Sequence, residues 1–207
     1  MTVYHWILAV SFGICIFICS FLFLQIIIAG APNDRAKSKG GSAAAIAYSL
    51  TFAMSPAKKE TAYRHLPTYT AGIIYHLGTF LSFILLTFQF FEIPLHDIVW
   101  MISSFCLVIS GICGTAILVK RIALPKMRGL SNPDDYTSNI LVTGFHFLSA
   151  LTILKTNLLQ VLFIYSSVLL IYIPAGKLKH VIYFFTSRIH LGIFYGRRGV
   201  WPLKGKE

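Results

Sequence analysis

The feature that most constrains this chain is a series of long apolar runs that carry no charge. Residues 4–29 contain no Asp, Glu, Lys or Arg. A run of this length suits a helix that crosses the roughly 30 Å hydrocarbon core of a bilayer, because each residue advances a helix by about 1.5 Å. It lacks the basic start and small-residue cleavage site of a signal peptide, so we expect it to be retained as a helix.

Four later segments have the same character, and together the five predict an all-α, polytopic bundle of five membrane helices. The later segments are residues 69–91, 98–119, 137–154 and 158–174. Composition agrees, because hydrophobic residues make up 56% of the chain and charged residues only 12%, about half the charge of a soluble domain. These values exclude a soluble enzyme, a secreted disulfide scaffold and a DNA-binding domain. The four cysteines form no Cys-x-x-Cys pair, and we interpret them as small buried hydrophobes.

The net charge of +11 is explained by topology, and no nucleic-acid partner is expected. Basic residues gather in the loop 30–68, between the third and fourth segments, and in the C-terminal tail, whereas Lys155, Glu92 and Asp97 are the charges expected on the opposite side. The positive-inside rule therefore predicts an outside N-terminus and a cytoplasmic C-terminus. We expect residues 1–185 to form the membrane domain, with the cytoplasmic loop 30–68, and residues 186–207 to form a basic cytoplasmic tail.

Two local patterns predict further helices. Residues 131–135 read Ser-Asn-Pro-Asp-Asp, which supplies a capping side chain, a proline suited to the first helical position and two acids at the positive end of the helix dipole. The fourth membrane helix is therefore expected to start before its apolar stretch. Residues 43–54 are apolar between polar flanks, which indicates a short helix along the membrane surface.

Histidines inside the apolar segments are the best candidates for function, because ionisable groups are costly within a bilayer. His76 and His146 lie at similar depths in the second and fourth segments. Two histidines from different helices are what a six-coordinate haem b requires, and the alternative is that they only hydrogen-bond neighbouring helices. Gly72 and Gly78 near His76, and Gly144 before His146, would allow a flat cofactor to approach the backbone.

Several short segments, in this order and spacing, resemble the gamma subunit of respiratory nitrate reductase and its relatives. These relatives include the membrane cytochromes of heterodisulfide reductase and of the sulfite-reduction-associated complex. The likeness covers most of the chain from the second segment onward. The segments are YHLG at 75–78, LVKR at 118–121 with Pro125 and Arg128, DY at 135–136, and YIPAGKLKH at 172–180.

The resemblance implies a cytochrome b whose cytoplasmic-side haem ligands correspond to His76 and His180. The family usually binds two haems b, but its outer-side ligand positions fall on Leu86 and Leu162 here. We therefore expect one haem b, with two as the alternative if His146 or His190 completes another pair. His146 has no counterpart in the family pattern. It has three possible roles: it replaces one of the expected ligands, it binds a second haem, or it only forms polar contacts between helices. Four basic residues are placed to contact haem propionates: Lys120, Arg121, Lys177 and Lys179. Each of them is also explained by the excess of basic residues on the cytoplasmic side.

The resemblance also implies partners. We expect electron transfer between menaquinone or another membrane quinone and a cytoplasmic iron–sulfur subunit of a respiratory complex in a prokaryotic inner membrane, with the catalytic site on another chain. Whether quinone binds this chain stays open. His190, Arg197, Arg198 and Trp201 are the expected docking residues for the partner, with anchoring at acidic lipid headgroups as the alternative. A haem-free membrane anchor is the competing function. A small transporter is disfavoured, because the segments contain no internal ionisable residue other than histidine and no inverted repeat.

Overall fold

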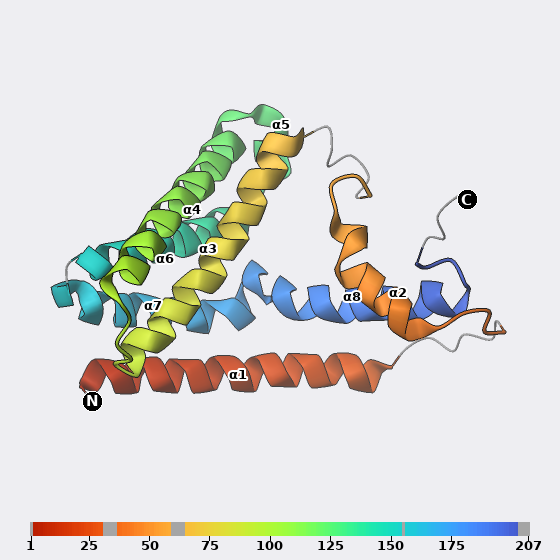
Figure 1. Ribbon diagram of the computed structural model, residues 1–207, viewed down its shortest axis with the longest axis horizontal. Coiled ribbons are helices and arrows are strands. Elements are labelled where there is room, and N and C mark those ends of the chain that lie inside the picture. Colours follow the sequence, from red (N-terminus) through yellow and green to blue (C-terminus); the bar gives the residue numbers. More distant parts are fainter. Residues whose placement is uncertain (1, 31–36, 59–64, 155, 203–207) are drawn as a thin grey trace. The chain divides into compact units, whose positions relative to one another are not determined.

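The computed structural model describes residues 2–30, 37–58, 65–154 and 156–202, and within these ranges the regular secondary structure is all helical. The basic residues Arg35, Lys59, Arg64, Lys155, Lys204 and Lys206 lie outside these ranges. Short 3₁₀ turns (Phe52–Met54, Thr156–Leu158, Lys177–Lys179) adjoin the helices. The α-helices, labelled in Figure 1, are α1 (Val3–Ala29), α2 (Ser42–Leu50), α3 (Leu66–Phe90), α4 (Asp97–Ala123), α5 (Pro125–Gly129), α6 (Pro133–Leu154), α7 (Leu159–Ala175) and α8 (His180–Arg197).

Three of the described helices, α1, α3 and α4, are long and apolar enough to cross a membrane. A fourth span results if α7 and the segment Lys177–Arg197 count as one broken span. The fourth and fifth expected segments are helical, as α6 and α7, but neither qualifies alone. Helix α6 is less apolar than a typical span because it carries many hydroxyl, amide and imidazole groups. Helix α7 is too short, because it has only 17 residues before the helix ends at Gly176.

The chain divides into two compact units. Unit 1 comprises Met1–Ile16 and Pro67–Leu178, and unit 2 comprises Phe17–Leu66 and Lys179–Glu207. Helix α1 contributes to both units, and the boundary near Lys179 differs from the expected division after residue 185. The C-terminal helix α8 therefore groups with the first loop in unit 2.

In unit 1, the ends of the helices follow from local chemistry. His96 caps α4 by accepting a hydrogen bond at Nδ1 from the Ile98 N–H at 3.3 Å. Helix α4 ends before Leu124, because Pro125 disfavours a helical conformation in the residue that precedes it. At the start of α6, Asp135 N–H donates to Asn132 Oδ1 and Asn132 N–H donates to Asp135 Oδ2, each at 3.0 Å. This reciprocal capping confirms the helix start expected from residues 131–135.

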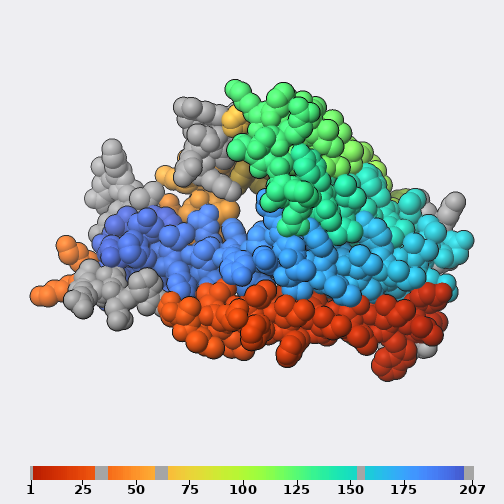
Figure 2. All heavy atoms as spheres, turned by 180° about the vertical axis from the view of Figure 1, so that it is seen from behind, coloured from red at the N-terminus to blue at the C-terminus, as the bar shows by residue number. Residues whose placement is uncertain are grey.

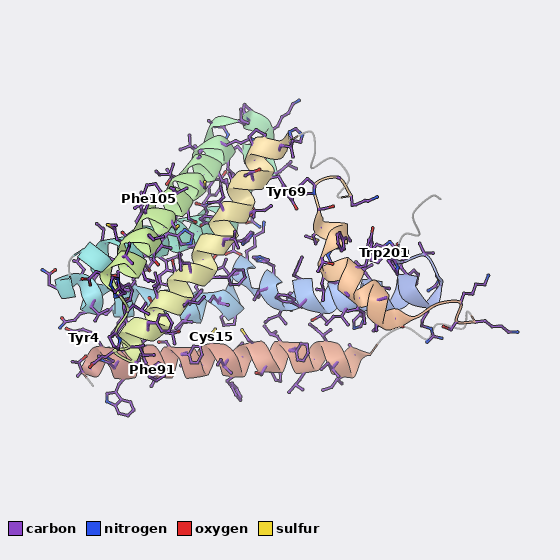
Figure 3. The ribbon with its side chains drawn as sticks, viewed as in Figure 1. Tyr4, Cys15, Tyr69, Phe91, Phe105 and Trp201 are labelled. Atoms are coloured by element: carbon purple, nitrogen blue, oxygen red, sulfur yellow. The ribbon has the colours of Figure 1, made fainter. Side chains whose placement is uncertain are left out.

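Helices α3, α4 and α6 share an apolar cluster. Leu85 of α3, Leu107 of α4 and Ala150 of α6 are all buried at its centre. Phe83 and Phe145 pack nearby, with ring centroids 5.0 Å apart. The space-filling view in Figure 2 shows α4 and α6, coloured green to teal, packed against each other. The outward faces of these helices carry large exposed hydrophobics such as Phe105, which Figure 3 labels, and a lipid bilayer is the solvent that such faces fit.

Unit 2 is built on the close packing of α2 against α8. Gly192 and Gly196 of α8 form a Gly-x-x-x-Gly pair that faces Ile46 and Ala45 of α2. A Cβ on Gly192 would lie 2.5 Å from Ile46 Cα, and one on Gly196 would lie 2.7 Å from Ala45 Cβ. Small residues at such spacing allow two helix backbones to approach closely. The expected short helix within residues 43–54 is confirmed as α2 with its 3₁₀ extension.

Candidate functional site

A row of polar side chains follows one face of α6 through the interior of unit 1. Its residues recur every three or four positions, the repeat of a single helix face. All but Asn139, which is half-buried, are buried. The row consists of Asp135, Asn139, Thr143, His146, Ser149 and Thr152. Such a stripe makes α6 the helix with the longest row of buried polar side chains among the described helices of unit 1.

His146 is the centre of this row, and its side chain is completely buried. Its Nε2 lies 3.0 Å from Thr79 Oγ1 of α3, and its Nδ1 lies 3.1 Å from Ser110 Oγ of α4. Thr79 Oγ1 is also 2.9 Å from the Tyr75 carbonyl, and Ser110 Oγ is 3.1 Å from the Ile74 carbonyl. Both ring nitrogens are thus occupied by hydroxyls from two other helices, which favours helix bridging among the three alternatives for His146.

Tyr75 extends the network toward the start of α6. Its hydroxyl donates to the Asn139 carbonyl at 3.0 Å and lies 3.1 Å from Thr143 Oγ1. Asn139 donates from Nδ2 to the Gly114 carbonyl at 3.3 Å. The Tyr75 ring meets the His146 ring edge to face at 5.0 Å. The network therefore links α3, α4 and α6 over more than one helical turn.

The glycines near the histidines have different surroundings. A Cβ on Gly78 would lie 2.0 Å from Ser110 Oγ, and one on Gly144 would lie 2.2 Å from the Tyr165 hydroxyl, so both positions serve side-chain packing. Gly72 differs, because a Cβ there would meet nothing within 4 Å. Of the three glycines, Gly72 alone leaves open space beside its helix.

His76 and His180, the expected axial ligands, both have exposed side chains. His76 lies on α3 in unit 1, one turn after Gly72, whereas His180 begins α8 in unit 2. Gly72, where a Cβ would meet nothing within 4 Å, lies four residues before His76 and so on the same face of α3. The two leucines at the expected outer ligand positions, Leu86 and Leu162, are buried inside unit 1.

A second polar cluster surrounds the buried carboxylate of Asp135. Arg121 at the end of α4 lies 3.2 Å from Asp135 Oδ1, and Lys177 after α7 pairs with the same oxygen. Asp135 precedes the apolar stretch of α6. The hydrogen bond from Lys177 is the main cause that holds the pKa of Asp135 below its ordinary value, and the bond from the Asn132 backbone and the charge of Arg121 act in the same direction against burial.

This cluster involves two of the four basic residues expected at haem propionates. Arg121 and Lys177 are paired with Asp135, which ties together the ends of α4, α6 and α7. Lys120 donates from Nζ to Thr68 Oγ1 at 2.5 Å. Lys179 lies in the 3₁₀ turn Lys177–Lys179 and belongs to unit 2. Two of the four expected propionate contacts, Arg121 and Lys177, are therefore paired with the carboxylate of Asp135.

The expected docking residues take part in the packing of unit 2. The ring of Trp201, which Figure 3 labels, packs at a tilt against the Tyr195 ring with centroids 4.6 Å apart and lies 5.5 Å from the Tyr48 ring of α2. The Arg197 carbonyl accepts a hydrogen bond from the Lys39 N–H at 2.6 Å. Arg198 lies over the Phe194 ring, 3.6 Å from its centroid. His190 is half-buried on α8. These contacts hold the tail against α2 and leave its docking role a prediction.

Sequence reasoning missed Thr79, Ser110 and the polar row on α6. The polar face of α6 could have been predicted, because its polar residues recur at the spacing of one helix face. Within the described ranges, no group of three or more His, Cys, Asp or Glu side chains is placed to hold a metal ion. An axial histidine pair would not form such a group.

Comparison with known proteins identifies no relative, because no family model, curated protein or solved structure matches the chain. The likeness to the nitrate reductase gamma subunit therefore rests on the short segments at 75–78, 118–121, 135–136 and 172–180. The described structure is that of a helical protein with three to four candidate membrane spans and a polar interior centred on His146.

Proposed function

We propose that the chain is a cytochrome b membrane subunit of a respiratory oxidoreductase. It would transfer electrons between the quinone pool and a cytoplasmic iron–sulfur partner. One observation supports this beyond the resemblance: His76 lies on a membrane-spanning helix, exposed, beside the open face at Gly72. A Cβ at Gly72, one turn before His76, would meet nothing within 4 Å, which leaves room beside α3 for a flat ring.

In this proposal His76 and His180 hold one haem b on the cytoplasmic side of a prokaryotic inner membrane. A bound haem would supply the one-electron chemistry, and the chain would provide the two imidazoles that hold it and an apolar surrounding. The proposed topology has five membrane-crossing segments, with the N-terminus outside and the basic loops cytoplasmic. The polar α6 then counts as a span whose buried polar face points into the bundle and whose exposed Ile140 and Leu151 face lipid.

The packed tail of unit 2 is the proposed docking face for the iron–sulfur partner. The described parts of unit 2 carry basic side chains but contain no Asp or Glu. These basic side chains would attract an acidic surface on a partner protein. The exposed aromatic rings Tyr183, Phe185 and Phe194 supply apolar contact area beside these charges.

The test is haem content of the purified full-length chain. A pyridine haemochrome assay and a reduced-minus-oxidised spectrum should give one haem b per chain. His76→Ala and His180→Ala should each abolish the Soret band, whereas His65→Ala, which changes an exposed histidine outside the proposed pair, should retain it. Two haems per chain would instead require another ligand pair.

The competing function is a haem-free membrane anchor, and one observation favours it. His146 is fully engaged by Thr79 and Ser110, as expected for a histidine that only joins helices. A chain that binds no haem under conditions in which it is folded and helical would support this anchor and reject the cytochrome.

A further inference from the structure

A groove of about 540 Å³ runs along the outward face of α4 in unit 1. Its lining consists of five residues of α4 and one ring of α6: Ile112, Thr115, Ala116, Val119, Lys120 and Phe147. Positions 112, 115, 116 and 119 lie on one face of the helix, since they recur at intervals of three or four residues. Because α4 is long and apolar enough to cross a membrane, this face opens toward lipid chains.

Small residues of α4 form the floor of the groove. The Phe147 ring lies against Gly111, where an added Cβ would fall 2.7 Å from a ring carbon. Thr115 donates its hydroxyl to the Gly111 carbonyl at 2.9 Å, so the hydroxyl in the lining is satisfied within its own helix. Ala116 adds only a methyl group beside it. The groove therefore accepts a hydrocarbon chain without leaving a polar group unpaired.

Lys120 supplies a positive charge at one end of the groove. It lies in the last turn of α4, is half-buried, and donates from Nζ to Thr68 Oγ1 at 2.5 Å. An ammonium has three N–H donors, so this bond orients the group and leaves donors for an anion. The neighbouring Arg121 is paired with Asp135, whereas the ion pairs among the described residues do not include Lys120. An anion from outside the described chain can therefore neutralise it.

The length of the groove suits one lipid chain better than a partner helix. From Ile112 to Lys120 the helix rises by about 12 Å. One leaflet of a hydrocarbon core of roughly 30 Å is about 15 Å deep. A second membrane helix would contact α4 across both leaflets, whereas an acyl chain enters one leaflet and ends at its headgroup. Lys120 follows the apolar stretch of α4, where such a headgroup lies.

We propose that this groove binds one anionic phospholipid, whose acyl chain lies along α4 and whose phosphate accepts a hydrogen bond from Lys120 Nζ. Basic sites at the ends of membrane helices bind anionic headgroups. Lipid chains surround the helix in any case, so the charge of Lys120 selects the headgroup while the groove holds the chain. The site gives Lys120 an anion other than a haem propionate. It goes beyond electron transfer and does not require haem, so it is tested separately from the proposed cytochrome.

Native mass spectrometry of the purified full-length chain tests the headgroup. The chain is titrated with dioleoylphosphatidylglycerol and dioleoylphosphatidylcholine, which share their acyl chains and differ in headgroup charge. The first phosphatidylglycerol should bind severalfold more tightly than the first phosphatidylcholine. Lys120→Gln should weaken phosphatidylglycerol binding about fivefold, the effect of one cation near an anionic headgroup, and leave phosphatidylcholine binding unchanged. Lys126→Gln, at an exposed position of α5 outside the groove, is the matched control. Equal affinities for the two lipids, or equal losses in the two variants, would overturn the proposal.

The same titration tests the groove itself. Ala116→Phe places a ring in the groove and should weaken binding of both lipids. Ile102→Phe, at an exposed position of α4 outside the groove, should bind both as the wild type does. Wild-type affinity in Ala116→Phe would show that the chain does not lie there. Inorganic phosphate should not displace the bound lipid, and displacement at millimolar concentration would indicate a site for the free anion instead of a phospholipid.

Discussion

Gly192 of α8 lies directly against the backbone of Ile46 in α2, where an added Cβ would fall 2.5 Å from Ile46 Cα and 2.8 Å from its nitrogen. Backbone atoms cannot rotate away as a side chain can. Gly192→Val should therefore separate α2 from α8 and destabilise unit 2 by about 1–3 kcal/mol or more. Limited trypsin digestion should show faster cleavage after Lys39 and Lys58, which flank α2.

Gly13→Val is the matched control for that change, because a Cβ on Gly13 would meet nothing within 4 Å. Both substitutions add the same side chain to an apolar helix, so a difference between them isolates the packing of α2 against α8. Equal digestion rates for the two variants would show that this contact does not stabilise unit 2.

The α2–α8 contact also shows which parts of the fold can be predicted from the sequence. The helices themselves follow from apolar runs and capping residues, as at Asn132 and Asp135, because these signals lie within a few residues of each other. The Gly192–Gly196 spacing signals close helix packing, but not the identity of the partner helix. That partner lies about 150 residues earlier in the chain, and only tertiary packing selects it.

The interior of α6 illustrates the same limit for the candidate site. The repeat of Asn139, Thr143 and His146 could have predicted a polar helix face. The hydroxyls that contact this face belong to Thr79 and Ser110 on other helices. No local sequence pattern predicts that these two residues face His146. Likewise, the basic character of Arg121 and Lys177 was evident, but their shared partner Asp135 emerges only from the meeting of three helix ends.

Asp135→Asn should destabilise unit 1, because Arg121 and Lys177 would lose their shared carboxylate. Loss of hydrogen bonds to a buried charged group costs about 1.5–3 kcal/mol. The measurement is the free energy of unfolding in detergent. Asp97→Asn, at the exposed first turn of α4, should cost less, about 0.3–1 kcal/mol through the helix dipole. Equal losses in the two variants would mean that the ion pairs at Asp135 add nothing.

Acid should remove the contribution of Asp135. Its pKa in the folded protein is held below the ordinary value of 3.8, chiefly by the hydrogen bond from Lys177. The stabilisation is therefore present above pH 3.8 and is lost as the pH falls through the lower pKa of the folded state. The Tm difference between wild type and Asp135→Asn should be constant near neutral pH and shrink below that value. A difference that grows in acid would show that another group dominates.

Filling the open face beside His76 tests whether a flat cofactor uses it. Gly72→Leu should leave the Tm of the haem-free protein nearly unchanged, because a Cβ at Gly72 meets nothing within 4 Å. If a haem lies against α3 at His76, the added side chain one turn away should lower haem occupancy severalfold, measured by the Soret absorbance per chain. Gly13→Leu, which also extends into open space, should retain full occupancy. Unchanged haem content in Gly72→Leu would place the cofactor away from this face and leave the exposed His76 without the role proposed for it.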